Sequence, residues 1–203
     1  MPFVSIEGID GSGKTEQVRL LVEHLRGTGR TVLQTKEPDG GQLGAEIRAI
    51  LTRGQRCLSP TEQLLLVSAA RFDHVRRVIR PALLAGHWVV SDRFIDSTYA
   101  FQVAVSDIDI KEMFRSVRDI VVGATMPNIT IVLDLPVDVA RTRRNCRNDA
   151  ALDPAEAERD FFAIRNGLLA AARLDTERCR IVDGNRPVAR VAHDIWQLIE
   201  PLL

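Results

Sequence analysis

Short apolar runs alternate along the chain with longer segments in which apolar residues recur every three to four positions. The short runs are rich in β-branched side chains and indicate buried strands, whereas the longer pattern indicates amphipathic helices. This alternation is typical of βαβ units around a parallel sheet covered on both faces. Strands are predicted at residues 3–7, 31–35, 88–91, 129–133 and 180–182. Helices are predicted at residues 14–26, 43–53, 60–84, 110–122, 137–146, 154–174 and 188–202.

The pattern gives no sign of a domain boundary. A chain of 203 residues suits one compact domain, and neither a repeat nor a low-complexity linker interrupts it. We therefore predict a single domain over residues 1–203. A polar, arginine-rich interruption lies between two helical patterns, and it predicts a flexible lid at about residues 143–154.

A glycine-rich motif, GIDGSGKT, directly follows the first predicted strand and opens a helix. This is the context that the G-x-x-x-x-G-K-[ST] phosphate-binding loop (P-loop) requires. Backbone N–H groups of the loop, the helix N-terminus and a lysine together surround nucleotide phosphates, and the hydroxyl after the lysine can ligate magnesium. The predicted ATP-phosphate site comprises Gly8, Asp10, Gly11, Ser12, Gly13, Lys14 and Thr15. A P-loop alone leaves motor, GTPase and kinase functions open, but the chain has no guanine-reading N-K-x-D tetrad.

A second anion site is indicated at the end of the third predicted strand. Ligands of open parallel sheets bind at the carboxyl ends of strands, where Asp92 and Arg93 stand. Asp92 can hold a magnesium-bound water, and Arg93 can present a bidentate fork to a second phosphate. An ordinary surface ion pair is the alternative for these two residues. Further cations at Lys36, Arg48 and Arg71 favour an acceptor that carries its own phosphate, although Arg71 could also lie on a helix surface.

Arginines crowd the beginning of the predicted lid, at positions 141, 143, 144 and 147. They could remain solvated and stabilise the helix dipole. Alternatively, a lid could close on ATP, exclude water and bring one or two of these guanidiniums against the transferring phosphoryl group. Phosphoryl transfer depends mainly on alignment and charge neutralisation, so the chemistry requires no histidine or serine nucleophile.

Overall charge and cysteine content limit the partners. Lys plus Arg equals Asp plus Glu at 27 each, which argues against a general nucleic-acid or membrane binder. The three cysteines lack metal-ligand spacing and favour reduced thiols in the cytoplasm. No stretch approaches the roughly 20 apolar residues that span a bilayer.

The chain resembles the thymidylate kinase family over most of its length. The resemblance rests on IEGIDGSGKT at residues 6–15, TKEPDGG at 35–41, AAR at 69–71 and DRFIDSTYAFQ at 92–102. It implies a three-layer α/β P-loop fold with a five-stranded parallel sheet, a homodimer, and transfer of the ATP γ-phosphoryl group to dTMP with Mg²⁺. It also implies catalytic roles for Lys14, Arg93, Arg143 and Arg147, and magnesium ligation through Thr15 and Asp92. An acceptor site is implied at Asp10, Lys36, Arg48, Val67, Arg71, Arg93, Ser97, Thr98, Phe101 and Gln102.

Within that resemblance, the acceptor site departs from the family pattern. Val67 stands where an aromatic ring usually stacks on the base, a loss of about 1–3 kcal/mol. Phe101 replaces a tyrosine, Lys36 an arginine and Asp39 a glycine. These departures leave three hypotheses: a dTMP kinase, a relative that phosphorylates another nucleoside monophosphate such as a modified pyrimidine, and a nucleotide-binding protein without turnover.

Overall fold

The computed structural model describes residues 1–52, 57–146 and 160–203, and its strands form a parallel five-stranded sheet. The strands are β1 (Phe3–Gly8), β2 (Val32–Lys36), β3 (Trp88–Asp92), β4 (Ile129–Asp134) and β5 (Cys179–Asp183). Their order is β2-β3-β1-β4-β5, so β1 is the central strand and pairs with β3 on one side and β4 on the other. Ligands of such sheets bind where the order reverses, beyond the carboxyl end of the central strand. The predicted α/β fold is confirmed, and every strand agrees with its predicted range to within one residue at either end.

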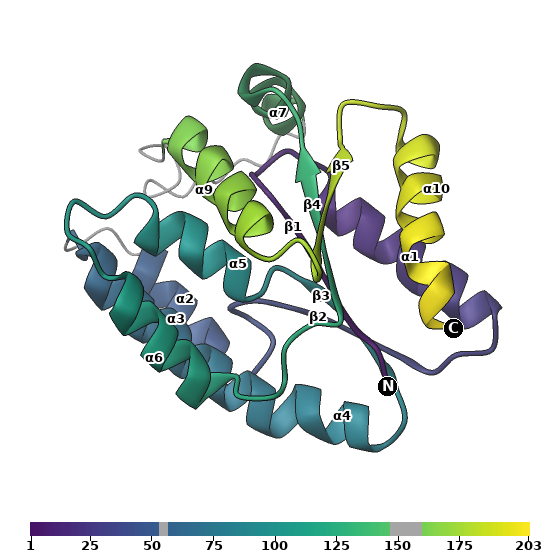
Figure 1. Ribbon diagram of the computed structural model, residues 1–203, viewed down its shortest axis with the longest axis horizontal. Coiled ribbons are helices and arrows are strands. Elements are labelled where there is room, and N and C mark those ends of the chain that lie inside the picture. Colours follow the sequence, from purple (N-terminus) through teal and green to yellow (C-terminus); the bar gives the residue numbers. More distant parts are fainter. Residues whose placement is uncertain (53–56, 147–159) are drawn as a thin grey trace.

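Helices cover both faces of the sheet, which gives three layers (Figure 1). The α-helices are α1 (Lys14–Gly27), α2 (Gly44–Thr52), α3 (Pro60–His74), α4 (Arg80–Leu84), α5 (Ile95–Thr98), α6 (Lys111–Val121), α7 (Val137–Asn145), α9 (Phe161–Leu174) and α10 (Val188–Ile199). On one face, α1 and α10 pack against the sheet through buried side chains such as Leu21, Leu25 and Ile195. On the other face, α3, α5, α6 and α9 enclose two further clusters, around Phe94 and around Leu168. No helix in the described part of the chain is long and apolar enough to cross a membrane.

Two helical segments differ from the prediction. The predicted helix at residues 60–84 contains a π-helical turn, Val75–Ile79, between α3 and α4. Residues 95–103, for which no helix was predicted, form α5 and a second π-helical turn, Tyr99–Val103. Ile95 and Thr98 are β-branched and have low helix propensity, so the helical pattern there is weak. Burial of Ile95, Ala100 and Val103 overrides that propensity.

The helix predicted from residue 154 begins in the structure at Phe161. The side chain of Asp160 accepts hydrogen bonds from the backbone N–H groups of Phe162 and Ala163, as an N-cap does. Residues 154–159 lie outside the described ranges. Gly167 of α9 leaves no room for a Cβ, which would lie 2.9 Å from the Cα of Ala100. This close approach fixes the turn of residues 99–103 against α9.

Candidate active site

The P-loop joins β1 to α1 at the carboxyl end of the central strand. Gly11 and Gly13 have φ angles of 88° and 91°, which disfavour residues with a side chain. A Cβ on Gly11 would also collide with the carbonyl group of Ala140 in α7, whereas the space beside Gly13 is open. The loop thus has the backbone of a phosphate cradle, with α7 packed against one side of it. The Oγ atom of Ser12 is buried there and has no hydrogen-bond partner among the described residues.

Lys14 points into this loop. Its Nζ donates a hydrogen bond to the carbonyl oxygen of Ile9 at 3.0 Å and lies 3.8 Å from Oδ1 of Asp10. Only 7% of the side chain is exposed, and burial together with the charge of Arg93 lowers the pKa of Lys14 to about 8. The ammonium group is therefore held in a site where a bound anion would be strongly stabilising.

Thr15 and Asp92 come together beside the P-loop. The hydroxyl of Thr15 donates a hydrogen bond to Oδ2 of Asp92 at 2.7 Å. The pairing of β1 with β3 places Ile6 opposite Asp92, which brings the end of β3 to the loop. A hydroxyl oxygen and a carboxylate oxygen at this distance suit a hard cation such as Mg²⁺.

Arg93 connects the P-loop to the next site. Its backbone has φ 72°, a conformation that is uncommon for a residue with a side chain and is often found at functional sites. The guanidinium donates to Oδ1 of Asp10 at 2.5 Å, to Oγ of Ser97 at 3.0 Å and to the carbonyl oxygen of Gly8 at 3.2 Å. It also lies over the ring of Phe101, 4.8 Å from the centroid. Arg93 is thereby fixed by partners from two segments of the chain, the P-loop and residues 97–101.

Glu7, to which the sequence interpretation assigned no role, holds the residues next to Arg93 in place. Its side chain is fully buried and accepts hydrogen bonds from the backbone N–H of Phe94 at 2.6 Å and from Oγ of Ser97 at 2.5 Å. Burial, with a smaller contribution from the charge of Asp96, raises the pKa of Glu7 to about 7. A glutamate at the end of an apolar strand, directly before the P-loop, was the available signal for such a role.

We expect Glu7→Gln to change how stability depends on pH. Between pH 4.5 and about 7 the folded wild type holds a proton on Glu7 that the unfolded chain has released. The free energy of unfolding of the wild type therefore falls as pH rises from 4.5 to about 7. Glu7→Gln cannot titrate, so its free energy of unfolding lacks this fall. Relative to wild type, the variant should gain stability between pH 4.5 and 8, by up to about 3 kcal/mol. Urea unfolding at a series of pH values measures this difference, with exposed Glu23→Gln as control; a constant difference between variant and wild type would contradict the prediction.

A pocket opens next to Arg93 and corresponds to the predicted acceptor site. It is lined by Asp10, Glu37, Pro38, Arg48, Leu51, Thr52, Val67, Arg71, Arg93, Phe94, Ser97, Thr98, Phe101 and Gln102. The structure thus gathers every predicted acceptor residue here except Lys36. Asp10 and Arg93 belong to both this pocket and the P-loop hydrogen-bond network. The pocket is therefore adjacent to the loop that would hold ATP.

Arg71 is buried, with 3% of its side chain exposed, and is not a helix-surface residue. It donates to Oε2 of Glu37 at 2.7 Å, to Oγ1 of Thr98 at 2.8 Å and to the carbonyl oxygen of Phe94 at 3.0 Å. The other carboxylate oxygen of Glu37 lies 3.1 Å from Nδ1 of the fully buried His74, whose Nε2 contacts Thr35 at 2.7 Å. The sequence interpretation gave Glu37 and His74 no role, yet they hold Arg71 in place.

Glycines let the loop after β2 pack against this buried group. A Cβ on Gly40 would collide with the imidazole of His74, and one on Gly41 would lie 2.9 Å from a carboxylate oxygen of Asp73. A Cβ on Gly44 would collide with the carbonyl group of Pro38. The backbone that borders the acceptor pocket therefore has no space for side chains at these glycines.

Lys36 and Arg48 are both close to Asp39. Nζ of Lys36 lies 2.9 Å and Nη1 of Arg48 3.7 Å from Oδ2 of Asp39, whose side chain is 16% exposed. Lys36 itself is 63% exposed and does not line the pocket. Two of the cations predicted for the acceptor site therefore share a carboxylate of the chain itself.

The predicted lid is described only at its beginning. Residues 143–145 belong to α7, while Arg147 and the rest of the lid to residue 154 lie outside the described ranges. Nη1 of Arg143 donates to the carbonyl oxygen of Gly184 at 2.9 Å, and a Cβ on Gly184 would lie 3.7 Å from the backbone oxygen of Ser12. Arg143 is thus anchored beside the P-loop, whereas Arg141 lies over the rings of Phe161 and Phe162 on α9.

Comparisons with known proteins agree with this geometry. The family model for thymidylate kinase matches residues 6–195. A thymidylate kinase of Dinoroseobacter shibae is 43% identical over 195 residues, covering 95% of this chain and 93% of that protein. One of Methylococcus capsulatus is 40% identical and covers 99% and 96%. The crystal structure of thymidylate kinase from Ehrlichia chaffeensis superimposes with a TM-score of 0.77 at 28% identity, covering 98% of each chain. The chain therefore belongs to the thymidylate kinase family.

Proposed function

We propose that this protein is a nucleoside monophosphate kinase that transfers the γ-phosphoryl group of ATP to dTMP. The observation that carries the proposal is the shared position of Arg93 and Asp10, which bond to each other at 2.5 Å between the P-loop and the acceptor pocket. A donor phosphate in the loop and an acceptor phosphate in the pocket would meet at this pair. Two reactants held in such proximity need little further chemistry from the protein.

On the ATP side, the P-loop backbone and Lys14 would hold the outer phosphates. The glycine conformations, the open space at Gly13 and the unpartnered hydroxyl of Ser12 fit such a group. Thr15 and Asp92 would hold Mg²⁺, which neutralises charge that develops on the phosphates. Arg143 would add a further positive charge, and Arg147 matches the second lid arginine of the family.

On the acceptor side, Arg93 would orient the acceptor phosphate so that one of its oxygens attacks the γ-phosphorus in line, with ADP leaving. Asp10 would bind the sugar hydroxyl. Arg71 would meet the pyrimidine base together with Thr98 and Gln102, while Val67 and Phe101 would contact its apolar faces. Lys36 and Arg48 would have to exchange Asp39 for the acceptor phosphate.

The direct test is ADP production with ATP and magnesium across a panel of nucleoside monophosphates: dTMP, dUMP, UMP, dCMP and 5-hydroxymethyl-dUMP. A clear preference for dTMP supports the proposal. A preference for another monophosphate supports a second candidate, a kinase for a modified pyrimidine nucleotide. Val67 in the pocket wall and Asp39 beside the phosphate cations favour that candidate.

Val67→Phe separates these two candidates. If dTMP is the natural acceptor, a ring at this position adds base stacking worth about 1–3 kcal/mol, so KM for dTMP should fall by about 5- to 150-fold. Steady-state kinetics with dTMP measures the change, and Leu84→Phe, at an exposed leucine of α4, is the control. An unchanged or higher KM for dTMP would favour an acceptor with a bulkier base.

We also propose that the protein works as a homodimer. Leu65 and Phe72 of α3 lie two helical turns apart on one exposed side and are 48% and 43% exposed. Phe72→Glu should yield monomers by light scattering, whereas Leu84→Glu, at a more exposed leucine of α4, should leave the mass unchanged. A wild-type protein with the mass of one chain would contradict this proposal.

The free, exposed thiols of Cys57 and Cys146 support a reducing compartment such as the cytoplasm.

A further inference from the structure

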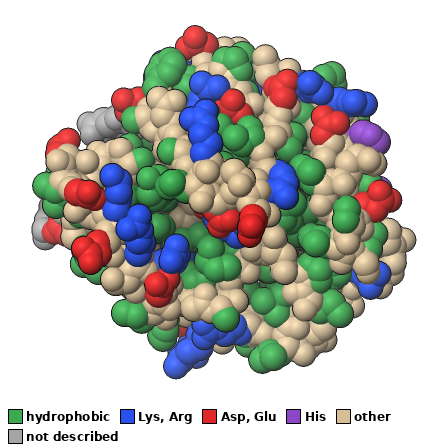
Figure 2. All heavy atoms as spheres, in the orientation of Figure 1, with side chains coloured by type: hydrophobic (Ala, Val, Ile, Leu, Met, Phe, Trp, Pro, Cys, Tyr) green, Lys and Arg blue, Asp and Glu red, His purple; other side chains and the backbone are tan. Residues whose placement is uncertain are grey.

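A second pocket lies on the other side of the segment 95–103, between α5, α6 and α9. Its volume is about 540 Å³, and it is separate from the P-loop and from the acceptor pocket. On the face shown in Figure 2, Lys and Arg side chains gather in the region of α6 beside a hollow. The proposed reaction leaves this pocket without a role.

The inner wall of the second pocket is apolar and aromatic. Tyr99 and Phe114 meet edge to face with their centroids 5.8 Å apart, and Ile95 and Met126 complete this part of the lining. The hydroxyl of Tyr99 has no hydrogen-bond partner among the described residues. The wall thus presents an apolar surface on which a flat ring of a ligand can lie. The hydroxyl of Tyr99 can form a hydrogen bond with the edge of that ring.

The rim of the second pocket is cationic. Lys111, Arg115 and Arg118 occupy successive turns along α6 and span about 10 Å of the helix axis. Lys111 and Arg118 are near the exposed carboxylates of Asp109 and Asp119, at 3.9 and 2.7 Å. Arg115 has no acidic partner among the described residues. A row of exposed cations at this spacing matches a chain of phosphates better than a single carboxylate.

The acidic residues of the second pocket are already paired. Arg178, 12% exposed, donates to both carboxylate oxygens of Asp96 at 2.7 and 2.8 Å and to Asp175 at 2.8 Å. With Arg178 included, four cations line the pocket against two carboxylates. The net charge of the lining is therefore positive, and both carboxylates are held by Arg178.

We infer that this second pocket binds a nucleotide-like anion, with a planar ring against Tyr99 and Phe114 and a phosphate chain along Lys111, Arg115 and Arg118. The inference stands apart from the proposed reaction, because it uses none of the residues assigned to ATP or to the acceptor. A nucleoside triphosphate has both of these chemical parts.

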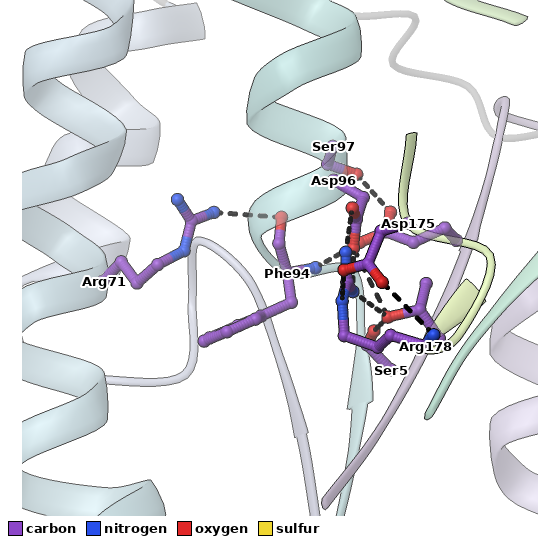
Figure 3. A network of polar contacts seen from close by, with 9 residues as sticks. Ser5, Arg71, Phe94, Asp96, Ser97, Asp175 and Arg178 are labelled. Carbon is purple, nitrogen blue, oxygen red and sulfur yellow. Dashed lines mark hydrogen bonds and ion pairs between the residues drawn. The ribbon is translucent and has the colours of Figure 1, made fainter. Parts of the chain in front are cut away.

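A ligand in the second pocket would change the affinity of the acceptor pocket for its substrate. Ile95, Asp96 and Tyr99 face the second pocket, whereas Ser97, Thr98 and Phe101 of the same segment line the acceptor pocket. Figure 3 shows Arg71 and Arg178 reaching this segment from opposite sides, with Phe94, Asp96 and Ser97 between them. A ligand that shifts the segment would change the affinity for the acceptor, and the acceptor would change that of the ligand equally.

The chain contains one tyrosine, which allows a specific test. Protein labelled with 3-fluorotyrosine gives a single ¹⁹F resonance, from Tyr99. With a non-hydrolysable ATP analogue, magnesium and excess dTMP filling the other sites, added dTTP should shift this resonance saturably. The double variant Arg115→Glu/Arg118→Glu should weaken the apparent affinity at least tenfold, whereas Arg173→Glu, at an exposed arginine of α9 outside the pocket, should not.

Three results would overturn the inference. The resonance could fail to shift with dTTP, or it could shift equally in the double variant, which would place dTTP in the acceptor pocket. Inorganic triphosphate could also compete as well as dTTP does, in which case the ring wall contributes nothing to binding.

Discussion

Lys14→Ala is expected to lower kcat for phosphoryl transfer by about 10²- to 10³-fold, the usual loss when a preorganised charge is removed from a transition state. The ammonium group is buried in the P-loop and held by the carbonyl oxygen of Ile9, so its charge has a fixed position in the site. A coupled assay of ADP release measures the effect. Arg190→Ala, at an exposed arginine of α10, is the control and should retain full kcat.

The same variant should not unfold the protein. Burial lowers the pKa of Lys14 to about 8, which means that the folded state disfavours the charge at neutral pH. Removing the ammonium group therefore relieves a cost of folding, and the urea midpoint should stay equal or rise. Activity that remains near wild type would contradict the role of Lys14 in phosphoryl transfer. A large loss of stability would contradict the conclusion that the buried charge of Lys14 opposes folding.

Arg71→Ala is expected to have the largest effect on stability, lowering the free energy of unfolding by about 3–5 kcal/mol. The substitution leaves Glu37 buried with only His74 as a partner, and it empties the hydrogen-bond positions at Thr98 and Phe94. Urea unfolding measures the loss. Arg76→Ala, at an exposed arginine in the π-helical turn that follows α3, should change stability little.

A double variant separates the ion pair from side-chain volume. Adding Glu37→Gln to Arg71→Ala removes the unpaired buried charge. The double variant should therefore lose less free energy of unfolding than the two single variants lose in sum. Simple additivity would mean that lost packing, and not the stranded carboxylate, explains the effect. KM for dTMP should rise in both variants that lack Arg71, because the proposed base contact is absent from each.

The nucleotide fold was predictable because its signals are local in the sequence. The P-loop lies in a continuous run between a strand and a helix, and Asp92 and Arg93 directly follow an apolar strand. Parallel pairing then brings these two runs together, as the prediction of a shared site requires. Both strands are buried along nearly their whole length, so the hydrophobic pattern indicates the strands but not the register of β1 against β3.

The partners of the site residues could not be predicted in the same way. Glu7 bonds with Ser97 across 90 positions, and Glu37 with His74 across 37, so no local pattern connects them. Lys36 was correctly placed at a strand end, but the sequence could not show that Asp39 would pair with it. The second pocket was missed because its lining comes from the segment 95–103, α6 and α9, which are far apart in the sequence.

The tightly packed glycines after β2 constrain how this enzyme can evolve. Gly40, Gly41 and Gly44 support the acceptor pocket with backbone alone, and substitutions there would push against His74, Asp73 or Pro38. Lineages that change acceptor preference should therefore keep these glycines and diverge at side chains that project from fixed backbone, such as Val67, Phe101 and Asp39. Comparing substitution rates at the two groups of positions among close relatives would trace the history of acceptor choice.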